Sequence, residues 1–138
     1  MSRDFQKSAV YNWEDSFHEG GIVNFEQAKV LVGYIWADMG YDSPPKVEAI
    51  SPNSSFSGEA NRLVIRFRPT VTLKTVLHEL AHSMTSELDY SDKHGPDFVG
   101  VYVKLLHKYM NVDLFEMIKT LAVSGVKMNY TAKPYFLD

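Results

Sequence analysis

The feature that most constrains this chain is a pair of histidines four residues apart inside an amphipathic segment. His78 and His82 enclose Glu79 in the sequence HELAH. Apolar residues recur around them at helical spacing and predict a helix from about Val71 to Leu88. Side chains four apart lie on neighbouring turns of one helix face, so both imidazoles can bind one metal ion at about 2.0 to 2.1 Å. The apolar stripe lies roughly 140° away, so we expect the histidines to face away from the core side of the helix.

The loop after this helix is expected to supply a third imidazole. A catalytic zinc ion has three protein ligands and leaves its fourth position to water. His94 follows His82 by twelve positions and stands before Gly95-Pro96, a pair that suits the cap and first turn of another helix. We therefore predict that Zn²⁺ is bound by His78, His82 and His94. Glu79 points about 100° round the helix from His78, where it can act as general base on an activated water.

Other ligands fit this pattern less well. The chain contains no cysteine, which excludes disulfides and thiolate metal sites. His107 lies inside a predicted helix, and His18 lies in an N-terminal region to which no element is assigned. Four carboxylates remain possible ligands, although solvated or capping roles suit them better: Glu87, Asp89, Asp92 and Asp97.

The remaining segments predict a mixed fold. The chain has 138 residues, 45% of them apolar, which suits one α+β domain spanning residues 1–138. In this domain a small sheet is expected to pack against the motif helix and two to three further helices. Segment 51–61 is rich in Ser, Asn and Gly and is expected to be a loop, and no element is predicted for the tail 126–138. Strands are expected over 46–51 and 62–68, and helices over 25–39, 96–110 and 113–125.

The strand at 62–68 carries arginines on one face and apolar residues on the other. The apolar face predicts a half-buried strand, and the arginine face is expected to be solvated rather than bound to acidic partners. Because it precedes the motif helix, this strand could also border the cleft and pair with an extended substrate. The residues of the arginine face are Arg62, Arg66 and Arg68.

The two motifs resemble those of a known group. HELAH followed by HGPDF resembles the small zincin-like metallopeptidases of bacteria and their phages, which share HExxH and a downstream HGPxF. The early Val10-Tyr11 and Glu14-Asp15 pairs and the region 122–126 are also similar to that group, and the likeness to SprT-like zinc proteases is looser. The resemblance implies a zincin-like fold in which the three histidines bind zinc and Glu79 is catalytic.

These residues together predict a zinc-dependent hydrolase, and most specifically a peptidase that acts on a peptide or protein. Zinc would activate a water and polarise the carbonyl, while Glu79 passes the water proton to the leaving amine. Two alternatives stay open. The first is a three-histidine zinc nuclease, although the net charge of -3 argues against binding to nucleic acid. The second is a metal-binding regulatory or interaction protein without turnover, in which Glu79 would have no use.

Two further expectations concern the oxyanion and the compartment. A phenol could stabilise the oxyanion, although packing is the commoner role of such side chains. No segment approaches about 18 consecutive apolar residues and the N-terminus is polar, so we expect a cytoplasmic protein without a membrane helix. The candidate phenols are Tyr90, Tyr102, Tyr130 and Tyr135.

Overall fold

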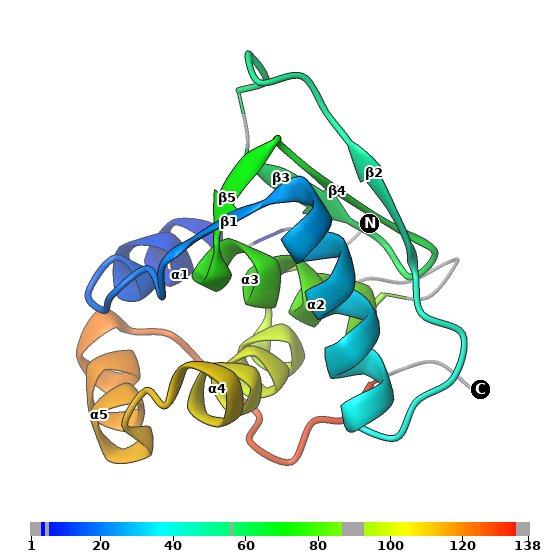
Figure 1. Cartoon of the computed structure of the whole chain (residues 1–138). Coiled ribbons are helices and arrows are strands. Elements are labelled where there is room, and N and C mark those ends of the chain that lie inside the picture. Colours follow the sequence, from blue (N-terminus) through cyan, green and yellow to red (C-terminus); the bar gives the residue numbers. More distant parts are fainter. Residues whose placement is uncertain (1–3, 5, 56, 87–92, 135–138) are drawn as a thin grey trace.

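The computed structural model describes residues 4, 6–55, 57–86 and 93–134. These residues form five helices and two small sheets, so the predicted α+β class is confirmed (Figure 1). The helices are α1 (Lys7–Glu14), α2 (Phe25–Asp38), α3 (Leu73–Met84), α4 (Pro96–Met110) and α5 (Leu114–Ser124). The strands are β1 (Ile22–Asn24), β2 (Lys46–Ala49), β3 (Gly58–Ala60), β4 (Val64–Phe67) and β5 (Thr70–Thr72).

The larger sheet has the strand order β2-β4-β3. β4 is its central strand, parallel to β2 and antiparallel to β3, while β1 and β5 form a separate antiparallel pair. Helix α3 packs against this sheet and contacts both β3 and β4. β3 is therefore an edge strand beside the helix that carries the HELAH motif.

The motif helix α3 begins and ends at local caps. The hydroxyl of Thr72 accepts a hydrogen bond from the backbone N–H of Thr75 at 3.2 Å, which starts the helix at Leu73. Thr85 is its C-cap, so the prediction of a helix from Val71 to Leu88 was too long. Val71 instead lies in β5, because this segment gains a partner in β1, and Leu88 lies outside the described residues.

Both sides of α3 are covered. Its apolar stripe is buried from Val76 to Met84, as expected, while Leu73 is partly buried; His78 and Glu79 are buried too. The expectation that the histidines face away from the core was wrong, because α4 packs on their side: the ring of Phe98 stacks on His82 with centroids 4.2 Å apart. The buried apolar residues of the stripe are Val76, Leu77, Leu80, Ala81 and Met84.

The three other predicted helices are confirmed by their caps. Asn24 and Gln27 form a capping box at the start of α2. Pro96 opens α4 after the N-cap Gly95. The Asp113 carboxylate caps α5, which ends where Gly125 adopts a left-handed conformation with φ of 70°.

Four elements were not predicted from the sequence. β3 lies in the segment expected to be a loop, β1 and α1 lie where no strand or helix was assigned, and β5 overlaps the start of the helix predicted from Val71. The three strands have three residues each, too few to show alternation, and they are stabilised by partners elsewhere in the chain. The predicted strand at 62–68 is shortened to β4, in which Ile65 and Phe67 are buried, while Leu63 lies outside it and is 58% exposed.

The tail, which could not be assigned from the sequence, packs on α4. The backbone N–H of Asn129 donates to the Pro96 carbonyl at 2.9 Å, and Val126 and Ala132 are buried. A Cβ at Gly100 would lie 1.9 Å from the Asn129 carbonyl oxygen, so this close approach requires glycine.

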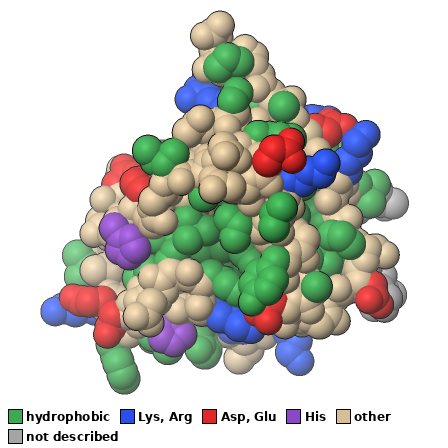
Figure 2. Space-filling view, in the orientation of Figure 1, with side chains coloured by type: hydrophobic (Ala, Val, Ile, Leu, Met, Phe, Trp, Pro, Cys, Tyr) green, Lys and Arg blue, Asp and Glu red, His purple; other side chains and the backbone are tan. Residues whose placement is uncertain are grey.

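The face of the molecule that carries α2 has both positive and negative side chains. Figure 2 shows hydrophobic side chains gathered near the centre of this face, with Lys and Arg scattered among Asp and Glu around them. This mixture agrees with the net charge of -3 and differs from a basic nucleic-acid footprint. In the described part of the chain, every helix is too short or too polar to cross a membrane.

Candidate metal centre

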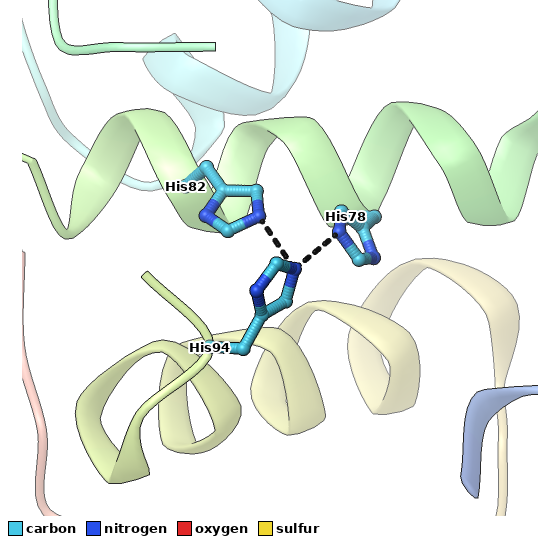
Figure 3. Close-up of side chains that lie close together, drawn as sticks. All are labelled: His78, His82 and His94. Atoms are coloured by element: carbon cyan, nitrogen blue, oxygen red, sulfur yellow. Dashed lines mark hydrogen bonds between the residues drawn. The ribbon is translucent and has the colours of Figure 1, made fainter. Parts of the chain in front are cut away.

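Three imidazoles converge between α3 and α4 (Figure 3). His78 and His82 come from successive turns of α3, and His94 comes from the position before the N-cap of α4. Nε2 of His94 lies 3.1 Å from Nε2 of His82 and 3.4 Å from Nε2 of His78. Zinc–nitrogen distances of about 2.0 to 2.1 Å in a tetrahedron place ligand nitrogens roughly 3.3 to 3.4 Å apart. The group is therefore able to hold one small metal ion.

Carboxylates fix which nitrogens face the centre. Nδ1 of His78 donates to Oε2 of Glu14 at 3.0 Å, and Nδ1 of His94 donates to Oδ2 of Asp4 at 2.7 Å. A neutral imidazole has one N–H, so both Nε2 atoms direct lone pairs at each other across 3.4 Å. A cation between them removes this repulsion. The donor set of neutral imidazoles suits zinc and other late transition metals.

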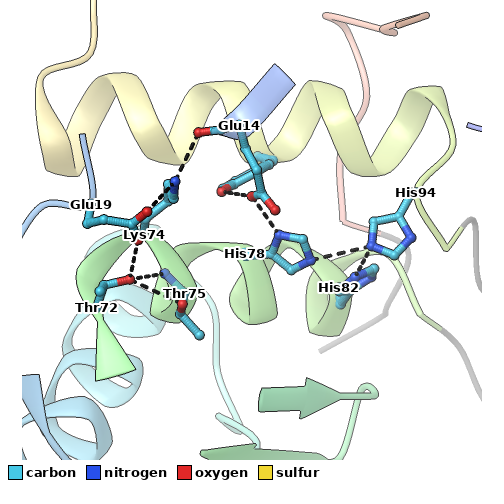
Figure 4. Close-up of polar contacts among 9 residues, drawn as sticks. Glu14, Glu19, Thr72, Lys74, Thr75, His78, His82 and His94 are labelled. Carbon is cyan, nitrogen blue, oxygen red and sulfur yellow. Dashed lines mark hydrogen bonds and ion pairs between the residues drawn. The ribbon is translucent and has the colours of Figure 1, made fainter. Parts of the chain in front are cut away.

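Glu14, like Asp4, is a residue of the site to which the sequence analysis gave no role. Its Oε2 also accepts a hydrogen bond from the buried Tyr102 hydroxyl at 2.6 Å, and its backbone carbonyl accepts one from Lys74 at 2.9 Å (Figure 4). Burial raises the pKa of Glu14, but the hydrogen bond and charge of His78, the Tyr102 hydroxyl and the charge of Lys74 lower it overall. The resemblance included Glu14, but no spacing rule connects it with His78.

The loop that carries His94 is tied to the N-terminus. Besides its side-chain contact, Asp4 accepts a hydrogen bond from the His94 backbone N–H at 3.3 Å. The buried Gln6 donates to the carbonyls of His94 and Lys127, both at 2.9 Å, and accepts from the Lys127 N–H at 2.9 Å. These contacts fix the backbone at His94 from two directions.

Glu79 lies beneath the edge strand β3 and is only 7% exposed. A Cβ at Gly58 would lie 3.0 Å from Cγ of Glu79 and 3.0 Å from the Arg66 carbonyl oxygen, so glycine lets the strand approach the helix. The pKa of Glu79 is raised to about 7, chiefly by burial; the charge of His78 lowers it in part, and the charges of Glu14 and Glu59 add to the rise. Such a carboxyl can both accept and release a proton near neutral pH.

An open cleft runs past the histidines and Glu79. Two adjoining cavities of about 300 and 340 Å³ share Tyr11, Gly58, His78 and Glu79 in their walls. Tyr11 is 40% exposed, and its ring is nearly parallel to the His78 ring, with an interplanar angle of 3° and centroids 5.7 Å apart. The centre is therefore open to a molecule from solvent.

The other candidate ligands and phenols are not brought to this centre. His18 and His107 are exposed, and Nδ1 of His107 donates to the Val112 carbonyl at 3.0 Å. Asp97 accepts from Asn129 at 2.9 Å. The Tyr102 hydroxyl is committed to Glu14, and Tyr130 is not among the described residues that line the cleft. The candidates Glu87, Asp89, Tyr90, Asp92 and Tyr135 lie outside the described residues.

The arginines of β4 and its flanks have partners within the protein. Arg66 lies between Glu48 and Glu59, at 3.0 and 3.2 Å. Arg62 donates to the Ser43 carbonyl, and Arg68 donates to the Ser54 carbonyl. Because β4 is paired on both sides, the expectation that it could accept an added strand was wrong.

The chain matches no protein-family model, no curated protein and no solved structure. The resemblance to zincin-like metallopeptidases therefore rests on the sequence features named above. The structure adds a group of three histidines able to hold a metal ion, with Glu79 in the wall of the same cleft.

Proposed function

We propose that the protein is a zinc-dependent hydrolase that cleaves amide bonds in a peptide or protein. The observation that carries this proposal is the convergence of His78, His82 and His94 beside the buried carboxyl of Glu79 in an open cleft. Zinc, when bound, supplies Lewis acidity to a substrate carbonyl and activates water. Glu79 accepts the proton of the attacking water and transfers it to the leaving amine.

The edge of β3 supports a peptide as substrate. The Arg68 N–H donates to the Ser57 carbonyl and the Asn61 N–H to the Val64 carbonyl, which makes Gly58 and Ala60 the non-hydrogen-bonded positions of the pair with β4. Their backbone N–H and C=O groups point away from β4, and both residues line the cleft. An extended peptide could add as a further strand there, with its backbone near Glu79.

Tyr11 is the phenol best placed to stabilise an oxyanion. It lines both cavities and lies against His78 and His94, with ring centroids at 5.7 and 5.1 Å. Burial raises its pKa to about 12, with further contributions from Glu79, Glu14 and Asp4, so it remains a donor at neutral pH. A donor held in the cleft wall strengthens as charge develops on the carbonyl oxygen.

The two alternative functions lack a comparable observation. A nuclease would need cations that bind phosphate, but the arginines at β4 already contact acceptors of this chain. A protein that binds metal without turnover would have no use for a buried carboxyl beside an open cleft.

A peptide-library digestion tests the proposal. Zinc-loaded wild type should cleave peptides, Glu79→Gln should retain zinc but lose cleavage, and the control Glu26→Gln, at an exposed carboxylate of α2, should cleave like wild type. Absence of cleavage by the zinc-loaded wild type would overturn the peptidase assignment. Undiminished cleavage by Glu79→Gln would overturn the role of Glu79.

A further inference from the structure

We propose that Asp4 and Glu14, termed here the N-terminal carboxylates, are positioning residues that set the metal affinity and couple metal binding to docking of the N-terminal region. This inference rests on the metal centre of the proposed function and is independent of whether the protein hydrolyses peptides. Neither residue is a ligand. Each acts through the imidazole that it contacts.

Glu14 holds His78 in one tautomer and one orientation. Oε2 accepts from Nδ1 of His78 at 3.0 Å (Figure 4). It also accepts from the Tyr102 hydroxyl at 2.6 Å, and both donor residues are buried. Two donors on one oxygen leave the carboxylate little freedom to rotate. In the neutral imidazole the proton is thereby held on Nδ1, which leaves the lone pair of Nε2 directed at the centre.

Asp4 does the same for His94 from another direction. Its two oxygens accept from the backbone N–H and from Nδ1 of that residue, at 3.3 and 2.7 Å. Gln6 then joins the same loop to Lys127 through three hydrogen bonds. The position of His94 thus depends on the N-terminus, which in turn is held to the tail.

The N-terminal carboxylates also balance the charge of a bound cation. Three neutral imidazoles leave the charge of a divalent cation uncompensated, whereas the N-terminal carboxylates supply two negative charges one hydrogen bond away from the ligands. A carboxylate on the outer N–H of a metal-binding imidazole raises its basicity, and its loss typically reduces metal affinity about 10- to 100-fold.

Metal binding and docking of α1 are coupled because the carboxylates and the imidazoles that they contact come from distant segments of the chain. α1 contributes Val10 and Trp13 to the core and packs on α5, while the imidazoles lie on or beside α3 and α4. A bound cation strengthens the hydrogen bonds that hold Asp4 and Glu14. By reciprocity, docking of α1 strengthens metal binding and metal binding stabilises docking of α1.

Competition with a chelator tests the affinity. Glu14→Gln and Asp4→Asn keep the shape and an acceptor oxygen but remove the charge, so the zinc dissociation constant of each should rise about 10- to 100-fold. The control Asp15→Asn removes an exposed charge at the end of the same helix and should leave the constant unchanged. The zinc-free melting temperature separates the roles, because a purely structural role would lower it without changing the zinc dissociation constant.

Amide exchange in the wild-type protein tests the coupling without any variant. Backbone amides of α1 should exchange more slowly in the zinc-loaded protein than in the zinc-free protein, more so than those of α2. Dissociation constants within twofold of wild type in both variants, or equal exchange of α1 in the two states, would overturn the proposal. A wild type that binds no zinc would overturn the metal centre as well, whereas zinc binding without hydrolysis would overturn only the proposed function.

Discussion

The carboxylate of Glu14 accepts a hydrogen bond from Nδ1 of His78 at 3.0 Å, although 64 positions separate the two residues. The same arrangement recurs between Asp4 and His94, which are 90 positions apart and 2.7 Å from each other. The candidate metal centre is thus built from three parts of the chain: the N-terminus, α3, and the start of α4. The two imidazoles that contact these carboxylates, His78 and His94, direct their Nε2 atoms toward each other at the centre.

Metal content should depend on His94. The purified wild type should contain about one zinc per chain, and His94→Ala should lose most of it, because two imidazoles alone do not complete a zinc site. Elemental analysis measures this, with His107→Ala as the control, since that imidazole is exposed on α4. Full occupancy in His94→Ala would refute its role as ligand.

Removal of zinc should lower the thermal stability. A ligand that binds only the folded state stabilises it by about 4.1 kcal/mol when present at 1,000 times its dissociation constant. Calorimetry should therefore show a lower melting temperature after chelation, restored by Zn²⁺. Mg²⁺ prefers oxygen ligands and should not restore it. Equal melting temperatures with and without zinc would contradict the proposal.

Zinc affinity should fall on acidification. Protons compete for the nitrogens that bind the metal, and imidazole has an ordinary pKa of about 6.5. Between pH 7.5 and 5.5 the dissociation constant should rise on the order of tenfold for each imidazole that gains a proton. Chelator competition across this range provides the measurement, and a constant affinity would speak against histidine ligands.

Tyr11→Phe should lower turnover without loss of metal. The substitution keeps the ring against His78 but removes the hydroxyl that is proposed to stabilise the oxyanion. Removal of one such donor typically costs about 100-fold or more in kcat. Steady-state kinetics on a cleaved peptide should show this with little change in KM, and Tyr130→Phe is the matched control. Equal kcat values would assign Tyr11 to packing alone.

Gly100→Ala should destabilise the fold. Its Cβ would meet the Asn129 carbonyl oxygen at 1.9 Å, so the backbone of the tail must move away from α4. Such overpacking costs about 1 to 3 kcal/mol. Gly33→Ala in α2 is the control, because its Cβ would meet no atom within 4 Å and alanine favours a helix. Denaturant unfolding compares the two, and equal stability would contradict the close packing.

Sequence reasoning succeeded where the signal is local. The starts of α4 and α5 followed from capping residues within a few positions, α2 followed from the helical spacing of its apolar residues, and the pairing of His78 with His82 followed from one helical turn. Sequence reasoning failed where an element depends on contacts with residues far away in the sequence. The helix at α3 was predicted too long because β1 pairs with residues 70–72, and the segment 58–60 became a strand only through pairing with β4.

The sequence by itself determined that two imidazoles share one face of a helix with a carboxyl beside them, because helix periodicity relates residues one turn apart. Only the tertiary structure decided that His94 completes the group, that Asp4 and Glu14 orient it, and that β3 forms the edge of the cleft. These contacts join segments far apart in the chain, and their formation depends on how helices and strands pack rather than on any repeating pattern along the sequence.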